Sequence, residues 1–292
     1  KIRKQKKHNF RSNPVYGADV NLDGEDFDDQ SGVSSIFDEF ESSSIERRVK
    51  AADAVNAIAA SGVTGITILV NAGILQKLLQ LLCDINVDGK ISAAGALRSM
   101  GLHGGSKLWE MLVGIDIMTA LLAAIRNVGT AFMASLGKAT HGGCPTNFHT
   151  LLDLLSSLCE NNETAVEHFN AHGLELVPHL IGLLEEPILI SYPNTADSAA
   201  QCIHVLTEDN DKVITTISSN ERSLSIIFSS LTSHNSSSLA SVLSAGILVN
   251  VGAWEGRAAV QEGIKAALAR AISVDHVSEL AALAEMLRNP LP

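Results

Sequence analysis

The feature that most constrains the fold of this chain is an internal repeat with a helical pattern. Five short segments of its 292 residues align with one another: AADAVNAIA (51–59), AAGALRSMG (93–101), LLDLLSSLC (151–159), AAQCIHVLT (199–207) and SAGILVNVG (244–252). Each has apolar residues at its second, fifth and eighth places, which lie along one side of a helix. The pattern therefore predicts five equivalent helices, each with one apolar stripe.

A second apolar segment follows each of these helices. The second segments are AGILQKLLQLL (72–82), VGIDIMTALLAAI (113–125), HGLELVPHLIGLL (172–184), NERSLSIIFSSL (220–231) and EGIKAALARAI (262–272). Glycine opens four of them, at Gly73, Gly114, Gly173 and Gly263, where we expect a positive φ and a sharp chain reversal. The first segments start 42, 58, 48 and 45 residues apart, against about 40–47 residues in armadillo and HEAT repeats.

These intervals predict an all-α fold, an armadillo/HEAT-like right-handed superhelical solenoid of about five repeats. Each unit has more apolar surface than it can bury alone, so neighbouring units must stack. A closed bundle of the same helices is the alternative. The regular period and an aromatic content of only 4% favour stacking between small, similar side chains. We assign residues 45–292 to the solenoid and explain the longest interval by a loop inserted at 128–147.

Charge separates the start of the chain from the rest. Six of its 21 basic residues lie in the first eleven positions, and Lys and Arg are then absent between Ser12 and Ile45, where nine acidic residues accumulate. This pattern predicts a disordered tail over residues 1–44, basic and then acidic; a merely solubilising terminus is the alternative. After residue 11 the chain has 15 basic and 32 acidic residues, a net charge of −17. Such a field attracts basic partners and repels nucleic acid phosphates, so we expect no direct nucleic acid binding.

The sequence contains fragments of catalytic and metal-binding motifs but no complete one. DINVDGKIS (84–92) opens like a calcium loop, yet Gly95 stands where the bidentate carboxylate belongs, so we expect Asp88 to cap a helix instead. His168 and His172 have helical spacing but lack further zinc ligands. We therefore predict no enzyme activity, no cofactor and no metal.

A membrane span and a disulfide scaffold are also disfavoured. The longest apolar stretch, residues 111–125, is interrupted by Asp116 and is shorter than the roughly 20 residues that a bilayer requires. Cys83, Cys159 and Cys202 fall in apolar helical stripes, where cysteine acts as a small hydrophobic side chain. Widely spaced cysteines fit a reducing compartment.

Binding remains as the function class, and polar residues on the repeated helices are the candidates. A solenoid of five units is about 50 Å long, because helices pack about 10 Å apart, and could hold roughly 15 residues of extended peptide. The expected contact residues are the polar places of the five helices and the acidic or amide residues of two equivalent turns: Asn56, Arg98, Ser157, Glu160, Asn161, His204, Glu208, Asp209, Asn210 and Asn250.

Longer stretches of sequence carry a family resemblance. AAGALRSMGLHGG, GIDIMTALLAAI, LLSSLCENNETAVEHFNAHGLELV, AAQCIHVLTEDNDKV and SAGILVNV follow one another in this order. Together they resemble the symportin family, also called HEAT-repeat-containing protein three, over about residues 46–272. The resemblance implies a nuclear import adaptor that chaperones the two basic large-subunit ribosomal proteins of the 5S particle and shuttles between cytoplasm and nucleus.

The same resemblance gives the basic start of the chain a role. Family members begin with a short basic segment read by a transportin-type karyopherin, and KIRKQKKHNFRSNPVY has a similar position and charge. The implied karyopherin-binding residues are Lys4, Lys6, Lys7, Arg11, Pro14 and Tyr16, although Val15 separates the proline from the tyrosine. Members continue into a second half of HEAT repeats, so we expect the cargo contacts of that half to lie outside these residues.

One other class of function remains open. A general armadillo scaffold, such as a conventional import receptor or a ubiquitin-ligase substrate module, would have the same fold. An import receptor should carry arrays of Trp-x-x-x-Asn, whereas Trp109 and Trp254 are not so placed. A ubiquitin-ligase module should carry a U-box or a similar domain, which we do not find.

Overall fold

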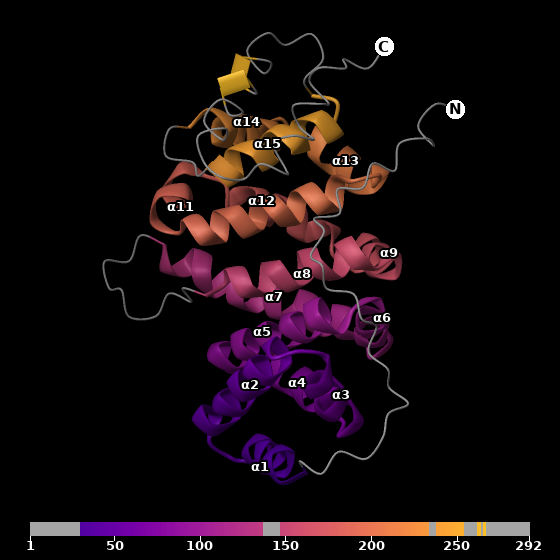
Figure 1. The fold of residues 1–292 in the computed structure, drawn as a ribbon. Coiled ribbons are helices and arrows are strands. Elements are labelled where there is room, and N and C mark those ends of the chain that lie inside the picture. The colour runs from indigo at the N-terminus through magenta and orange to yellow at the C-terminus, as the bar shows by residue number, and fades with distance from the viewer. Residues whose placement is uncertain (1–29, 137–146, 234–237, 254–261, 264, 267–292) are drawn as a thin grey trace.

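The computed structural model describes residues 30–136, 147–233, 238–253, 262–263 and 265–266, and throughout this part of the chain the regular structure is helical. The helices stack from α1 (Gln30–Phe40) at one end to α14 (Glu221–Thr232) and α15 (Ser238–Asn250) at the other (Figure 1). The predicted all-α solenoid is therefore confirmed.

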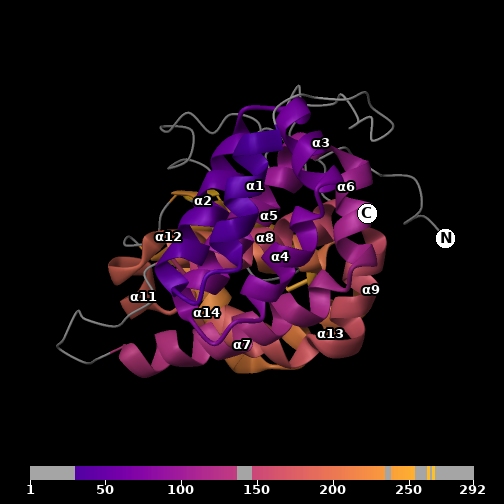
Figure 2. The same ribbon diagram turned by 90° about the horizontal axis from the view of Figure 1, so that it is seen from below.

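The helices form three columns, as expected of armadillo-type units. The first column contains α3 (Val63–Asn71), α6 (Ser106–Gly114), α9 (Glu163–His172) and α13 (Asp211–Ser218), which lie along one side of the end view in Figure 2. The second contains α4 (Ile74–Leu82), α7 (Ile117–Ser135), α10 (Val177–Gly182) with the preceding 3-10 turn η2 (Leu174–Leu176), and α14. The third contains α2 (Ile45–Ala60), α5 (Val87–Gly104), α8 (His149–Asn161), α12 (Pro193–Thr207) and α15.

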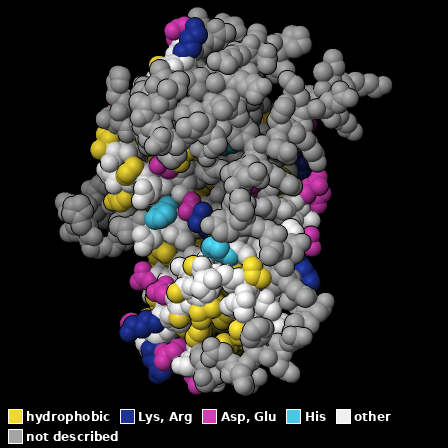
Figure 3. All heavy atoms as spheres, in the orientation of Figure 1, with side chains coloured by type: hydrophobic (Ala, Val, Ile, Leu, Met, Phe, Trp, Pro, Cys, Tyr) yellow, Lys and Arg dark blue, Asp and Glu magenta, His cyan; other side chains and the backbone are white. Residues whose placement is uncertain are grey.

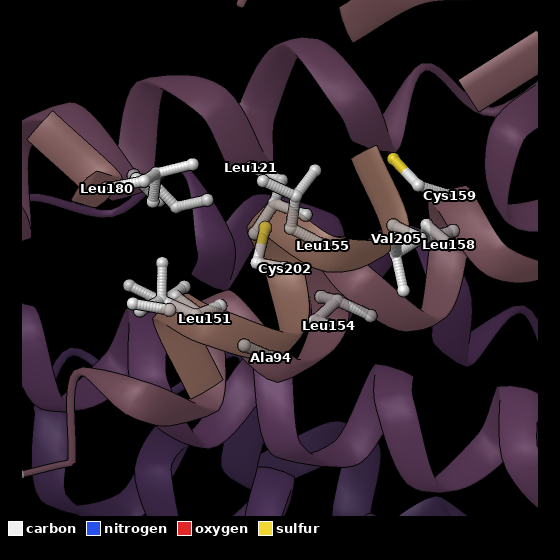
Figure 4. Close-up of a cluster of buried hydrophobic side chains, with 14 of the residues drawn as sticks. Ala94, Leu121, Leu151, Leu154, Leu155, Leu158, Cys159, Leu180, Cys202 and Val205 are labelled. Atoms are coloured by element: carbon white, nitrogen blue, oxygen red, sulfur yellow. The ribbon is translucent and has the colours of Figure 1, made fainter. Parts of the chain in front are cut away.

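We call the five helices of the third column the ladder helices, because each packs against the next one in the chain: α2 on α5, α5 on α8, α8 on α12 and α12 on α15. They contain the five repeated segments found in the sequence. The apolar stripes at the second, fifth and eighth places are buried, apart from the partly buried Ile58. Figure 4 shows part of the resulting core, in which Leu151 and Leu155 of α8 lie close to Cys202 of α12.

The cysteines occupy different environments. Cys159 and Cys202 are buried as predicted, and burial raises the pKa of the Cys159 thiol to about 12. Cys83 is exposed at the end of α4, so its assignment to a buried stripe was wrong. The helix ends at this residue and the chain turns outward toward Ile85, which is 97% exposed.

The structure changes two of the predicted boundaries. Helix α1 lies inside the segment that we predicted as a tail, because Ile36 and Phe37 pack against the first ladder helix and Phe40 is buried. Helix α7 continues to Ser135, inside the predicted loop at 128–147, because Val128 and Phe132 are buried and extend its apolar side. Residues 1–29 and 137–146 lie outside the described part of the chain.

The turn at DINVDGKIS is a helix cap, but a different residue makes it. Asn86, rather than Asp88, is the N-cap of α5, and its Oδ1 accepts a hydrogen bond from the Gly89 amide at 2.9 Å. Asp84 accepts from the Asn86 amide and pairs with Arg48 at 2.9 Å. Asn has the same capping preference as Asp, and its position two residues earlier sets the start of the helix.

The glycines that open the second segments are not equivalent. Gly73 has a φ of +85°, as predicted, but Gly173 has a φ of −122° and neither Gly114 nor Gly263 has a positive φ. In the second unit Asp116, at φ +61°, makes the reversal instead. The expectation of a glycine turn therefore holds at one of four positions, because the register of the turn differs between units.

This difference predicts opposite effects of alanine at two of the glycines. We expect Gly73→Ala to destabilise the protein by about 1 kcal/mol, because a side chain is strained in the left-handed region. Gly114→Ala, in the last turn of α6 and with nothing within 4 Å of the added carbon, should be neutral or slightly stabilising. Urea denaturation of both variants tests this, and equal losses would contradict it.

Helix α7 is long and apolar enough to cross a membrane by length and composition, and the bent pair of α3 and α4 would pass the same test together. Half of the apolar stretch of α7 is buried inside the protein, where the helix packs against α4, α8 and α9. Burial of this kind is typical of a core helix.

Candidate protein-interaction face

One side of the ladder helices offers polar groups for binding. The third, sixth and tenth places of each repeated segment have the spacing i, i+3 and i+7, so they share one side of the helix. We call this side the ladder face. Its residues, helix by helix, are Asp53, Asn56 and Ala60; Gly95, Arg98 and Leu102; Asp153, Ser156 and Glu160; Gln201, His204 and Glu208; and Gly246, Val249 and Ala253.

Acidic residues outnumber basic ones on the ladder face. Asp53, Asp153, Glu160 and Glu208 belong to it, whereas Arg98 is its only Lys or Arg. The sequence interpretation included three of these five residues but omitted Asp53 and Asp153. Both occupy the third place of a repeated segment, which lies one helical turn before the sixth place. The repeat pattern could therefore have identified them. On the surface seen in Figure 3, charged side chains of both signs lie in small groups beside apolar ones.

Three acidic residues form an acidic ridge, which we define as Glu160, Glu208 and Asp209. Glu160 belongs to the last turn of α8 and Glu208 follows α12, so the packing of α8 against α12 brings two predicted residues together. Helix C-termini carry partial negative charge, which adds to that of the carboxylates. The ridge is therefore suited to a cation.

The two glutamates of the ridge hold their protons more tightly than ordinary glutamates. Burial, together with the nearby charges of Glu160 and Asp209, raises the pKa of Glu208 to about 7. Burial also raises the pKa of Glu160. The side chain of Glu208 is still 47% exposed, so a ligand can reach it. A cationic ligand would favour the ionised form of both groups.

His204 is a structural residue rather than a free ligand. Its ring packs directly on Gly246 of α15, where an added Cβ would lie 2.6 Å from Nε2. Burial lowers the pKa of His204 to about 4, so the imidazole is neutral at neutral pH. Its Nδ1 lies 3.5 Å from Oε1 of Glu208, but this contact is not an ion pair while the ring is uncharged.

Several predicted amide contacts are used inside the fold. Asn250 donates from Nδ2 to Oγ1 of Thr207 at 3.0 Å, which ties α15 to α12. Asn210 donates to Oδ1 of Asn170 at 3.0 Å and is the N-cap of α13. Asn161 donates to the carbonyl oxygen of Ser157 at 2.7 Å. The Asn250 bond joins two ladder helices, the Asn210 bond joins α13 to α9, and the Asn161 bond stays within α8. These amides therefore make contacts inside the fold, and their role toward a partner stays a prediction.

The remaining predicted residues differ in exposure. Asn56 is exposed on α2, whereas Ser157 is buried. Arg98 is partly buried, and its Nε has no hydrogen-bond partner. The predicted karyopherin-binding residues, Lys4 to Tyr16, lie outside the described residues. Among the described residues, no group of three or more His, Cys, Asp and Glu side chains is arranged to hold a metal ion.

Two curated proteins are similar to this chain in sequence. HEAT repeat-containing protein 3 of Mus musculus is 30% identical over 146 residues, which are 48% of this chain and 21% of that protein. HEAT repeat-containing protein 3 of Homo sapiens is 26% identical over 154 residues, 49% of this chain and 22% of that protein. The chain thus spans about a fifth of the length of these relatives. No protein-family model matches it.

Solved structures confirm the fold. A designed armadillo repeat protein superposes with a TM-score of 0.61 at 15% identity, covering 88% of this chain and 98% of that one. A second designed armadillo repeat protein, in complex with the peptide (KR)4, superposes with a TM-score of 0.60 at 15% identity, covering 88% of this chain and all of the other. The chain is therefore an armadillo-like helical-repeat scaffold, and its predicted resemblance to HEAT repeat-containing protein 3 is confirmed over about half its length.

Proposed function

We propose that this chain is the armadillo part of a non-enzymatic nuclear import adaptor that binds the basic ribosomal proteins of the 5S particle. The observation that carries the proposal is the acidic ridge, in which Glu160, Glu208 and Asp209 meet at the ends of two stacked helices. A ribosomal protein outside the ribosome has a strongly basic surface that must be kept from RNA. A negatively charged ladder face can mask such a surface.

The comparisons support the kind of partner. A designed armadillo repeat protein with the same fold binds a peptide of alternating Lys and Arg. The two HEAT repeat-containing proteins are 30% and 26% identical to about half of this chain. In the proposed role the basic start of the chain, including Lys4, Lys6, Lys7 and Arg11, binds a transportin-type karyopherin. The protein then carries its cargo from cytoplasm to nucleus and supports ribosome biogenesis.

The test removes the charge of the ridge while keeping its shape. We expect the triple variant Glu160→Gln, Glu208→Gln and Asp209→Asn to bind both 5S-particle ribosomal proteins at least about tenfold more weakly at low salt, because each lost carboxylate weakens the attraction to a cationic surface. Isothermal titration calorimetry with the purified proteins measures this. The difference between variant and wild type should shrink as salt screens the charges.

A matched control removes three charges elsewhere. Glu110 of α6, Glu167 of α9 and Glu221 of α14 are exposed and lie outside the ladder helices. Their triple change to Gln alters the net charge equally and should leave the affinity within about threefold of wild type, because these carboxylates lie outside the proposed contact surface. Equal losses in the two triple variants would argue against the ridge, and no binding by the folded wild type would refute the function. A general armadillo scaffold with other partners is the alternative.

A further inference from the structure

Two histidines lie side by side on α9, away from the ladder face. His168 and His172 are four residues apart on this helix, so they share one side of it. The centres of their rings are 4.8 Å apart, and the ring planes are inclined by 55°. His172 is exposed and His168 is partly exposed, so an ion in the solvent can reach both rings. The proposed function uses neither of them.

Both histidines are held in place by the neighbouring helix α7. The hydroxyl of Thr119 donates to Oδ1 of Asp116 at 2.9 Å and lies 3.3 Å from Nε2 of His168. Because a hydroxyl has one hydrogen, Thr119 accepts from Nε2–H, and the neutral ring has its unprotonated nitrogen at Nδ1. Arg126 donates to the backbone carbonyl oxygen of His172 at 2.5 Å. A hydrogen bond from one ring nitrogen is typical of metal-binding histidines, because it fixes the tautomer and orientation of the ring.

The distance between the two rings matches that of two imidazoles bound to one metal ion. A ligand nitrogen lies about 2.1 Å from a zinc ion, so the centre of its ring lies about 3.2 Å from the ion. When the two metal–nitrogen bonds make an angle of about 90° to 110°, the ring centres are about 4.5–5.2 Å apart. The observed separation of 4.8 Å falls within this range. A stacking contact without an ion is the alternative.

We infer that His168 and His172 bind one divalent transition-metal ion of the class that prefers imidazole nitrogen, which includes Zn²⁺, Cu²⁺ and Ni²⁺. Two histidines at this helical spacing supply two of the zinc ligands in metalloproteases. The described residues bring no third His, Cys, Asp or Glu to the pair. This excludes a zinc site with four protein ligands among them, but it leaves a two-histidine site whose other positions are filled by water. Such a site binds an ion at the surface and has no catalytic base.

Zinc chloride added to the whole chain tests the site, and the ring signals of the histidines in nuclear magnetic resonance spectra report the binding. We expect the signals of His168 and His172 to shift together with one apparent Kd. His172→Ala should weaken zinc binding at His168 at least about tenfold, because a single imidazole remains. His179→Ala is the matched control, since His179 is exposed in α10 and lies outside the pair. It should leave that Kd within about twofold of wild type.

Thr119 tests the positioning of the His168 ring. Thr119→Val keeps the size of the side chain but removes the hydroxyl, and should weaken zinc binding about tenfold. Thr119→Ser keeps the hydroxyl and should bind as wild type does. Urea denaturation checks that each variant is folded.

Three results would overturn the shared site. One is that the two ring signals shift at different zinc concentrations, or that neither shifts at about 1 mM zinc. The second is a Kd at His168 that His172→Ala leaves unchanged. The third is an equal loss of affinity in His172→Ala and His179→Ala. None of these results would change the expected effect of the acidic ridge on a basic partner, because the pair lies on a different column of helices.

Discussion

Replacing Gly101 with alanine is expected to destabilise this protein by about 2 kcal/mol, although glycine to alanine normally stabilises a helix. Gly101 lies in α5, and a Cβ added there would come within 2.3 Å of the indole ring of Trp109. The ring cannot move aside easily, because Trp109 belongs to the following helix α6 and is buried where α6 packs against α5. Overpacking of this kind typically costs 1–3 kcal/mol, more than the gain of about 1 kcal/mol in helix propensity.

A second glycine of the same helix provides the control. At Gly95 the added carbon would meet only Cγ2 of Thr150 at 3.6 Å, an ordinary contact. Gly95→Ala should therefore stabilise the protein by about 0.5–1 kcal/mol. Urea denaturation gives both free energies of unfolding. In a Trp109→Leu background the cost of Gly101→Ala should largely disappear, and a cost that persisted there would show that the contact with the indole is not its cause.

The three-helix units illustrate how much of the fold the sequence predicts. The five ladder helices were found because each must bury an Ala- or Leu-rich stripe against the next, and this requirement repeats at a visible interval. The turns between helices were predicted less well. Asp116 rather than Gly114 makes the reversal in the second unit, because only the residue at the turn itself needs a left-handed backbone conformation. The position of that turn along the sequence, its register, differs between units. Such register depends on contacts between units that periodicity does not describe.

The candidate site shows a similar division. Glu160 and Glu208 could be paired from the sequence, because equivalent places in a repeat lie side by side when the units stack. His204 could not be distinguished from them, since its burial depends on the absence of a side chain at Gly246 in the next helix. The hydrogen bonds of Asn210 and Asn250 join residues about 40 positions apart. Whether a polar side chain serves the fold or a partner is decided by such long-range contacts.

The stability of the protein depends on pH through two residues, Glu208 of the acidic ridge and the buried His204. At pH values between 4.5, the ordinary pKa of a glutamate, and about 7, Glu208 is protonated in the folded state but ionised in the unfolded state. The free energy of unfolding therefore falls as pH rises through this range. His204 has the opposite effect. Its pKa falls from 6.5 to about 4 on folding, so stability falls as pH decreases through that range. The two contributions largely cancel between about pH 4.5 and 6.5.

The affinity for a basic partner is therefore expected to fall several-fold, and by no more than about tenfold, between pH 8 and pH 6 without unfolding of the protein. As pH falls through the pKa of about 7, Glu208 gains a proton and the ridge loses one negative charge. A bound cation favours the ionised carboxylate, so the partner must displace this proton at low pH. Protonation of one carboxyl can weaken the affinity by at most about tenfold for each pH unit below its pKa. The loss of affinity is smaller here, because about half of the Glu208 side chain is exposed and solvent screens its charge.

The variant Glu208→Gln separates this effect from other pH-dependent contributions. It should bind the basic partner more weakly than wild type at pH 8 but about equally at pH 6, because wild type is itself mostly protonated at this position there. Calorimetric titrations at both pH values, with a lysine- and arginine-rich partner that does not titrate in this range, measure the change. Residual pH dependence in Glu208→Gln would be assigned to Glu160, whose pKa burial also raises. A wild-type affinity that stays constant from pH 6 to pH 8 would mean that the cation does not bind next to Glu208, since no partner can contact a protonated carboxyl and an ionised one with the same free energy.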